Sequence, residues 1–236
     1  SLPRGCLDDL RTVLKAYHIG LKLKDERSSG EVTDFTFHGK LTEPQEQALK
    51  DVLSEDFGVF VAPPGAGKTV IAIAAIAERK TNVLILTHRK PLMEQWRLQL
   101  SSLLGLDKKE IGQIGGGKNK SNGRVDIAMV QSLDSGRSVD PRIADYGFII
   151  VDECHHVSAF SFEKALTQAK AKYVLGLTAT PYRRDGQQPI IHMQCGPICH
   201  QMTRKDLPEQ SQSACVKQIS VATGRKTPKS TQCGIR

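Results

Sequence analysis

The sequence lacks the features that mark membrane-spanning and secreted proteins. Its apolar runs, such as VLILT at 83–87 and FIIV at 148–151, fall far short of the roughly 18 to 20 residues that a transmembrane helix needs. The first ten residues, SLPRGCLDDL, contain no apolar core of the kind found in a signal peptide. We therefore expect a soluble intracellular protein that has no membrane partner.

Closely spaced cysteine pairs are also absent. The six cysteines stand at positions 6, 154, 195, 199, 215 and 233, and they show no CxxC pair and no regular spacing. The pattern therefore indicates neither a zinc knuckle nor a disulfide framework. We expect all six side chains to be reduced thiols.

Acidic residues are scarce only at one end of the chain. The net charge is +8, but residues 203–236 hold seven Lys or Arg against two Asp or Glu, which leaves +3 for the remaining 26 basic and 23 acidic residues. A solvated basic tail is the interpretation that we favour, and a tail that binds nucleic acid is the alternative. Because residues 201–236 are polar and show no periodicity, we expect them to be disordered or poorly packed.

The first forty residues form a small accessory module in our interpretation. Leucines and a tyrosine at a spacing of three and four predict a helix over residues 7–17. HIGLKLK at 18–24 and DFTFHG at 34–39 alternate apolar and polar residues, with a break between them. This alternation predicts two strands of a hairpin. We therefore expect a helix and a hairpin within residues 1–40.

From residue 41 to about residue 200, strand patterns alternate with helix patterns. Five apolar runs predict strands at 57–62, 82–87, 125–130, 146–152 and 172–178, and helices are predicted at 69–80, 91–105 and 161–172. Continuous apolar strands that alternate with helices are typical of a parallel sheet covered on both faces. The predicted fold class is therefore α/β, and ligands of such sheets bind at the carboxyl ends of the strands.

The stretch APPGAGKT, Ala62–Thr69, lies between a predicted strand and a predicted helix. Glycines let the backbone N–H groups of such a loop face a phosphate, and the helix that follows adds the positive end of its dipole. Lys68 would neutralise the β- and γ-phosphates, and the Thr69 hydroxyl would help to hold Mg²⁺. The general pattern GxxxxGK[ST] begins with glycine, whereas this stretch begins with Ala62. An ordinary glycine turn is the alternative, which the flanking strand and helix disfavour.

The stretch IIVDECHHVS at 149–158 places two acids, a cysteine and two histidines directly after a predicted strand. Asp152 at the strand tip would hold Mg²⁺, and Glu153 would orient and deprotonate the attacking water. A zinc site at 154–156 is the alternative, but three adjacent ligands cannot easily point at one ion. We therefore expect Cys154 to be a packing residue, and we expect the metal to arrive with the nucleotide.

These motifs, in this order, resemble those of the superfamily 2 helicases and translocases that act on DNA or RNA. APPGAGKT is similar to the first motif of the family in the form AxxGxGKT, and DECH at 152–155 resembles its DEAD/DEAH box. TAT at 178–180, THRKPLMEQW at 87–96 and LTEPQEQAL at 41–49 resemble three further motifs. The likeness covers about residues 41–184. It is closest to the branch that holds excision-repair and branch-migration helicases and the motor subunits of type III restriction enzymes.

The resemblance implies a RecA-like P-loop NTPase domain over residues 41–200, preceded by a small module that probes DNA. Its cofactors would be ATP and Mg²⁺. The implied site roles are adenine contact by Gln45; phosphate and Mg²⁺ binding by Pro64, Gly65, Ala66, Gly67, Lys68 and Thr69; metal binding by Asp152; catalysis by Lys68, Asp152 and Glu153; coupling by His155, Thr178, Ala179 and Thr180; and strand contact by Arg89, Gln131 and Ser132. No role is implied for His156. Contacts to strand phosphates set register and affinity without reading sequence.

Several residues outside these core motifs keep two interpretations. Without the resemblance, Arg89 and Lys90 are the solvated start of a helix. Trp96 is the only tryptophan, and we expect it to pack in the core rather than to stack on a base. The loop GGGKNKSNGR at 115–124 fits a flexible phosphate contact and a plain linker equally well. The two arginines at 183–184 fit a surface role as well as a site role.

The second half of a superfamily 2 motor has no counterpart in the sequence pattern. A complete motor has two RecA-like domains, and the arginine fingers of the second are worth roughly 10³ to 10⁵ in rate. The roughly fifty residues that follow TPYRRD at 180–185 are too few for such a domain. We therefore expect the chain to bind ATP, to hydrolyse it weakly, and to need a second RecA-like domain in cis or in trans. The unpatterned tail favours a truncated motor.

Two functions are therefore in competition. The first is the ATP-binding motor domain of a DNA helicase or translocase, with DNA favoured over RNA only by the branch that the chain resembles. The second is a non-catalytic module, descended from such a motor, that binds nucleic acid or a protein partner. The intact Lys68, Thr69, Asp152 and Glu153 argue for the first function. The missing second domain argues for the other.

Overall fold

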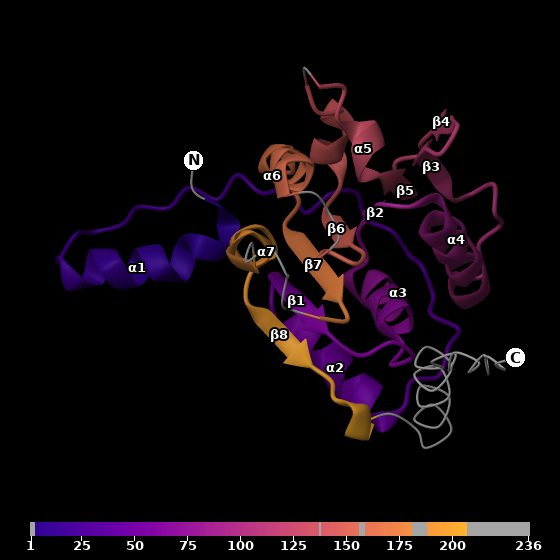
Figure 1. Cartoon of the computed structure of the whole chain (residues 1–236), viewed down its shortest axis with the longest axis horizontal. Coiled ribbons are helices and arrows are strands. Elements are labelled where there is room, and N and C mark those ends of the chain that lie inside the picture. The colour runs from indigo at the N-terminus through magenta and orange to yellow at the C-terminus, as the bar shows by residue number, and fades with distance from the viewer. Residues whose placement is uncertain (1–2, 137, 156–158, 181–187, 207–236) are drawn as a thin grey trace, which may run out of the picture.

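The protein is built around an eight-stranded sheet that is parallel apart from one edge strand. The computed structural model describes residues 3–136, 138–155, 159–180 and 188–206. The strands, in the order in which they pair, are β4 (Lys118–Lys120), β3 (Gly112–Gly115), β5 (Val125–Met129), β2 (Val83–Thr87), β6 (Phe148–Val151), β7 (Tyr173–Thr178), β1 (Phe57–Val61) and β8 (Ile198–Gln201). Only β4 runs antiparallel to its neighbour β3. The five predicted strands and the parallel arrangement are confirmed (Figure 1).

Helices cover both faces of the sheet, as the α/β pattern predicted. One face packs against α2 (Glu43–Ser54), α3 (Lys68–Arg79) and α4 (Lys90–Leu104), and the other packs against α5 (Val130–Leu133), α6 (Ala159–Gln168) and α7 (Gln188–Cys195). Side chains of a strand alternate between the two faces. In β2, Ile85 therefore lies in the core under α3 and α4, and Leu84 lies in the core on the opposite face.

The central helix α3 is buried along most of its length. All residues of Ile71–Ala77 are buried, because α3 lies against the sheet and contacts α2 on one side and α4 on the other. A helix that is apolar all round is suited to such a position, and its alanines permit close approach of its neighbours. The rigid packing of α3 also fixes its first residue, Lys68, at the carboxyl end of β1.

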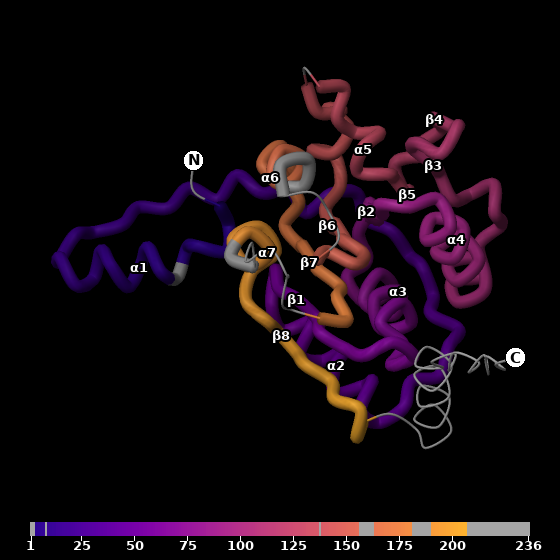
Figure 2. Tube along the Cα trace, viewed as in Figure 1, coloured from indigo at the N-terminus to yellow at the C-terminus, as the bar shows by residue number. Residues whose placement is uncertain are grey.

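The N-terminal segment forms the predicted helix but not the predicted hairpin. A single 3₁₀ turn, η1 (Arg4–Cys6), leads into α1 (Leu7–Ala16), and no strand occurs over the described residues 17–40. Figures 1 and 2 show α1 reaching away from the body and the chain after it running back across the molecule to α2. The alternation at 18–24 predicted a strand wrongly, because that segment has no neighbouring strand to pair with.

The later part of this segment contacts the body directly. Ser28 and Val32 each form an isolated bridge to residues that precede β7 and β2, and Phe35 lies in the core that packs under α3 and α4. At the start of the chain, the Arg4 guanidinium donates to the carbonyl oxygens of Ala169 and Ala171, each at 2.9 Å. The division of the chain at residue 40 into module and domain stays a prediction.

The sequence patterns did not predict three parts of the structure. Residues 112–120 form the β3–β4 hairpin, so the glycine-rich loop at 115–124 is not a plain linker. β8 pairs with β1 and extends the sheet by one strand. Met202 is buried and its N–H donates to the Val61 carbonyl oxygen at 2.8 Å, so the expectation of a poorly packed tail is wrong at Met202. The tail at 207–236 lies outside the described residues.

Two short 3₁₀ turns complete the description. They are η2 (Pro141–Asp145), which precedes β6, and η3 (Arg204–Asp206), which follows β8. Among the helices of the described residues, none is both long enough and apolar enough to cross a membrane.

Candidate active site

The predicted phosphate loop connects β1 to α3 at the carboxyl edge of the sheet. Gly65 and Gly67 both have φ of +85°, a conformation that L-residues with a Cβ adopt only with strain. Lys68, the first residue of α3, donates from Nζ to the Ala62 carbonyl oxygen at 3.0 Å, so its side chain folds back over the loop. Burial lowers the pKa of Lys68, whereas the neighbouring carboxylates Glu153 and Asp152 raise it in opposition. The loop therefore has the form that phosphate binding requires, with an ammonium group above it.

Gln45 is fixed against this loop from the start of α2. Its Oε1 accepts the Thr42 N–H at 3.0 Å as half of a capping box, and its Nε2 donates to the Ala66 carbonyl oxygen at 3.0 Å. A Cβ built on Gly67 would lie 2.5 Å from the same Nε2. The structure thus brings Gln45 and the phosphate loop together, as the family motif required. Its contact with adenine stays a prediction.

Asp152 follows β6, two strands away from β1, and lies at the same edge of the sheet. Its N–H donates to the Leu86 carbonyl oxygen at 2.9 Å, and its Oδ2 accepts the Trp96 indole N–H at 2.8 Å. The side chain is only 6% exposed. Burial is the main cause that raises the pKa of Asp152, and the hydrogen bond from Trp96 and the charge of Lys68 oppose it.

Trp96 is the site residue that the sequence analysis missed. The expectation that it packs in the core is confirmed, since it is 1% exposed in the middle of α4. Its N–H, however, is directed at the carboxylate predicted to hold Mg²⁺. A buried indole N–H needs an acceptor, which was the available signal, but the identity of the acceptor depends on how α4 packs on the sheet.

Glu153 has a backbone conformation that is uncommon for a residue with a side chain. Its φ is +48°, in the left-handed region, and its Oε2 is buried without a hydrogen bond among the described residues. The same oxygen lies 3.3 Å from His155 Nδ1. A carboxylate oxygen can accept more than one hydrogen bond, so a reacting water or a bound ligand group could donate to Oε2 beside His155.

His155 connects this carboxylate to the end of β7. The Thr178 hydroxyl lies 2.8 Å from His155 Nδ1, donates to the Thr180 carbonyl oxygen at 2.7 Å, and accepts the Thr180 N–H at 3.1 Å. The Ala62 N–H donates to the Thr178 carbonyl oxygen at 3.0 Å. One continuous set of contacts therefore runs from Glu153 through His155 and Thr178 to the phosphate loop, with Ala179 inside the turn.

The residues at this edge fit a magnesium nucleotide better than a transition metal. Thr69 and Asp152 offer oxygen atoms, which Mg²⁺ prefers. Cys154 is fully buried in the apolar core, as predicted, and burial raises the pKa of its thiol. No group of three His, Cys, Asp or Glu side chains within the described part of the chain is arranged to hold a metal ion. His156, the third member of the zinc alternative, lies outside that part.

The three predicted strand-contact residues also lie near one another. Arg89 is exposed and caps the start of α4, and the neighbouring Lys90 is exposed too. Gln131 Nε2 donates to the His88 carbonyl oxygen at 3.3 Å, and Ser132 lies directly against Gly115 at the end of β3. Arg89 follows β2, and Gln131 and Ser132 follow β5, so these exposed residues lie at the carboxyl edge of the sheet. The arginines at 183–184 lie outside the described residues.

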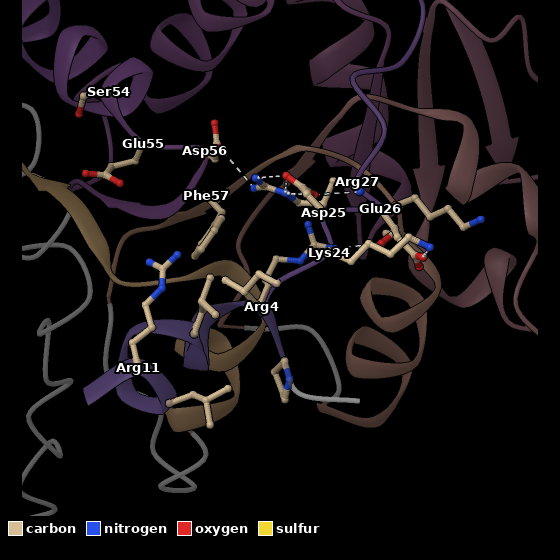
Figure 3. Close-up of a pocket in the computed structure, with 16 residues that line it drawn as sticks. Arg4, Arg11, Lys24, Asp25, Glu26, Arg27, Ser54, Glu55, Asp56 and Phe57 are labelled. Carbon is tan, nitrogen blue, oxygen red and sulfur yellow. Dashed lines mark hydrogen bonds and ion pairs between the residues drawn. The ribbon is translucent and has the colours of Figure 1, made fainter. Parts of the chain in front are cut away.

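A cavity of about 830 Å³ lies at the opposite, amino edge of the sheet. It is an open cavity between α1, the segment around Arg27 and the start of β1, and Figure 3 shows the ion pairs of Arg27 with Asp25 and Asp56 on its wall. None of the predicted site residues lines it. Since nucleotides bind such sheets at the carboxyl edge, this cavity is not part of the candidate active site.

The chain matches the family described as "Type III restriction enzyme, res subunit" over residues 38–183. The DNA 3'-5' helicase XPB of Kineococcus radiotolerans is 33% identical over 172 residues, which cover 70% of this chain and 30% of that protein. The DNA 3'-5' helicase XPB of Mycobacterium tuberculosis is 30% identical over 201 residues, which cover 81% and 36%. The chain therefore spans about a third of the length of these curated relatives.

Solved helicase structures share the fold. The crystal structure of the UvsW helicase from bacteriophage T4 matches with a TM-score of 0.65 at 15% identity, covering 83% of this chain and 78% of that one. The Hef helicase domain of Pyrococcus furiosus matches with a TM-score of 0.51 at 27% identity, covering 63% and 35%. The predicted RecA-like fold is confirmed by this likeness.

Proposed function

The chain belongs to the family of the type III restriction enzyme res subunit, and from this premise we propose that it is the ATP-binding motor domain of a DNA helicase or translocase. One observation carries the proposal: the phosphate loop, Asp152, Glu153 and Thr178 meet at the carboxyl ends of adjacent strands. Two observations support this convergence. The Ala62 N–H donates to the Thr178 carbonyl oxygen, and the charges of Glu153 and Asp152 act to raise the pKa of Lys68.

Each residue of the site then has a chemical task. The loop N–H groups and Lys68 bind the β- and γ-phosphates, and the Thr69 hydroxyl and the Asp152 carboxylate hold the metal. Bound Mg²⁺ would supply positive charge that stabilises the negative charge of the phosphates. Glu153 accepts a proton from the attacking water through Oε2, which has no hydrogen-bond partner among the described residues and lies beside His155 Nδ1. Gln45 contacts the adenine.

The contacts of His155 connect the proposed nucleotide site to the turn that follows β7. His155 lies between Glu153 and Thr178, and the hydroxyl of Thr178 organises the turn to Thr180. A change at the γ-phosphate that moves Glu153 would therefore also shift that turn through His155. Arg89, Gln131 and Ser132 would contact the phosphates of a DNA strand, which requires no reading of sequence.

A second RecA-like domain, in cis or in trans, would complete the motor. Its arginine fingers are worth roughly 10³ to 10⁵ in rate, so the chain by itself should bind ATP well and hydrolyse it slowly. The two XPB relatives described above are named DNA 3'-5' helicases, and each is more than twice as long as this chain. DNA is therefore the nucleic acid that we propose, rather than RNA.

Binding of a fluorescent ATP analogue in Mg²⁺ tests the nucleotide site directly. We expect Lys68→Ala to weaken binding at least about tenfold, because a charge-assisted hydrogen bond to phosphate is lost. Glu153→Gln should retain bound ATP while turnover is lost. The exposed Lys108→Ala is the matched control and should bind like the wild type. Unchanged binding by Lys68→Ala would refute the proposal.

ATP hydrolysis separates this proposal from a non-catalytic nucleic-acid or partner-binding module. The rate is measured with the chain alone, with single-stranded DNA, with single-stranded RNA, and after addition of a candidate second RecA-like domain. A motor domain should gain rate with DNA and more with the second domain, and Arg89→Ala should weaken the effect of DNA. A chain that binds ATP but shows no hydrolysis in any mixture would support the non-catalytic module.

A further inference from the structure

The one tryptophan of the chain hydrogen-bonds to the carboxylate that is expected to hold Mg²⁺. Trp96 Nε1 lies 2.8 Å from Asp152 Oδ2, and the two side chains are 1% and 6% exposed. They are 56 residues apart in sequence and belong to α4 and to the end of β6. The bond is well within the normal range for an N–H donor and a carboxylate acceptor, and it is shielded from water.

This donor has the properties that a metal-binding carboxylate needs from a neighbour. It is neutral, so it stabilises the negative carboxylate without adding a positive charge that would compete with the cation. Its position is also restricted, because Trp96 is 1% exposed and belongs to the same buried core cluster as Met93 and Leu100 of its helix. A carboxylate rotated about its last torsion would present its oxygens in the wrong direction, and the indole N–H restricts that rotation.

On the basis of the proposed function, we propose that Trp96 is a positioning residue that holds the Asp152 carboxylate in the orientation that binds the magnesium of the nucleotide. It touches neither nucleotide nor metal. Its role is that of an outer partner of a metal ligand, and loss of such partners typically weakens metal binding about 10- to 100-fold. Replacement of Trp96 should therefore change how nucleotide binding depends on the Mg²⁺ concentration. It should also remove packing contacts of the ring.

The same domain contains a matched control. The Tyr146 hydroxyl donates to Asp126 Oδ2 at 2.6 Å, and both side chains are buried. Tyr146→Phe therefore also removes an aromatic donor from a buried aspartate, but at the amino end of β5, away from the phosphate loop. Both variants are expected to lower stability, and Trp96→Phe more so because it also leaves a cavity in the core, whereas only Trp96→Phe should alter Mg²⁺ dependence.

The experiment titrates Mg²⁺ into the whole chain with a fluorescent ADP analogue and repeats the nucleotide titration in EDTA. We expect Trp96→Phe to raise the Mg²⁺ concentration for half-maximal nucleotide binding at least about tenfold, with binding in EDTA unchanged. Tyr146→Phe should follow the wild-type curve. If Trp96→Phe also follows that curve, the inference is refuted. If the wild type itself shows no effect of Mg²⁺, the proposed function fails, and the inference fails with it.

A second variant and a second readout keep the test decisive if Trp96→Phe does not fold. Replacement of Trp96 by benzothienylalanine keeps the shape of the ring system and removes only the N–H, and it should give the same shift in Mg²⁺ dependence. In the wild type, Trp96 is the only tryptophan, so its emission reports this one position. We expect the emission to change when Mg²⁺ is added to the ADP complex and not when ADP is added in EDTA. An emission that ignores Mg²⁺ would contradict the inference.

Discussion

Replacement of Gly67 by alanine tests how tightly Gln45 fixes the phosphate loop. Gly65 and Gly67 share a φ of +85°, so a Cβ at either position meets the same backbone strain. Their surroundings differ. A Cβ at Gly65 would meet nothing within 4 Å, whereas a Cβ at Gly67 would lie 2.5 Å from Gln45 Nε2. The pair therefore separates backbone strain from a side-chain clash.

The expected losses in the free energy of unfolding follow from the backbone strain and from the side-chain clash. Left-handed backbone costs an L-residue about 1–2 kcal/mol, which is the whole effect expected for Gly65→Ala. Gly67→Ala must also displace Gln45 from the Ala66 carbonyl oxygen, and the lost hydrogen bond adds about 1 kcal/mol. We therefore expect Gly67→Ala to lower the free energy of unfolding by about 2–3 kcal/mol.

The assay is urea unfolding followed by circular dichroism without nucleotide, with the midpoint compared at constant slope. The Gln45→Ala background supplies the control, because the side chain that clashes is then absent. In that background Gly67→Ala should cost only as much as Gly65→Ala, which gives a coupling energy of about 1 kcal/mol between positions 45 and 67. Equal costs for the two alanines in the native background, or an excess at Gly67 that persists without Gln45, would refute the reasoning.

Two further predictions concern hydrogen bonds away from the nucleotide. Tyr146→Phe should lower the free energy of unfolding by about 1–3 kcal/mol, because Asp126 loses its buried phenol donor and keeps only backbone donors; urea unfolding measures the loss. Asp51→Asn should cost less than about 1 kcal/mol near neutral pH, because the carboxylate that accepts from His200 Nδ1 at 2.6 Å is 37% exposed. The hydrogen bond from His200 lowers the pKa of Asp51, so this cost should be present above about pH 4 and vanish as the pH falls further, which unfolding at a series of pH values would show.

The long, strongly patterned elements were predictable from sequence alone. α3 follows a glycine loop and repeats apolar residues for three turns, β6 is apolar throughout, and β2 is apolar up to its last residue, Thr87. Short elements at the sheet edge were not. β8 has only four residues with exposed ends, and its place beside β1 depends on a contact between residues about 140 positions apart. The segment at 18–24 shows the opposite failure, since alternation alone cannot create a partner strand.

The candidate site shows the same division. Lys68, Thr69, Asp152 and Glu153 could be proposed from the sequence because a loop motif and a strand tip are local features of the chain. The hydrogen bond from Trp96 could not be found, because it joins a helix to a strand that are adjacent only in the folded sheet. A buried tryptophan predicts that its N–H has some acceptor, but only tertiary structure says which one.

The left-handed backbone of Glu153 has a consequence for laboratory evolution. At φ of +48°, glycine would relieve about 1–2 kcal/mol of strain, so Glu153→Gly should be among the substitutions that make the fold more resistant to heat. A library of this protein selected only for thermal resistance would therefore drift toward loss of its proposed base. Any such campaign needs a second selection for turnover, because heat resistance and catalysis impose opposite demands at this one position.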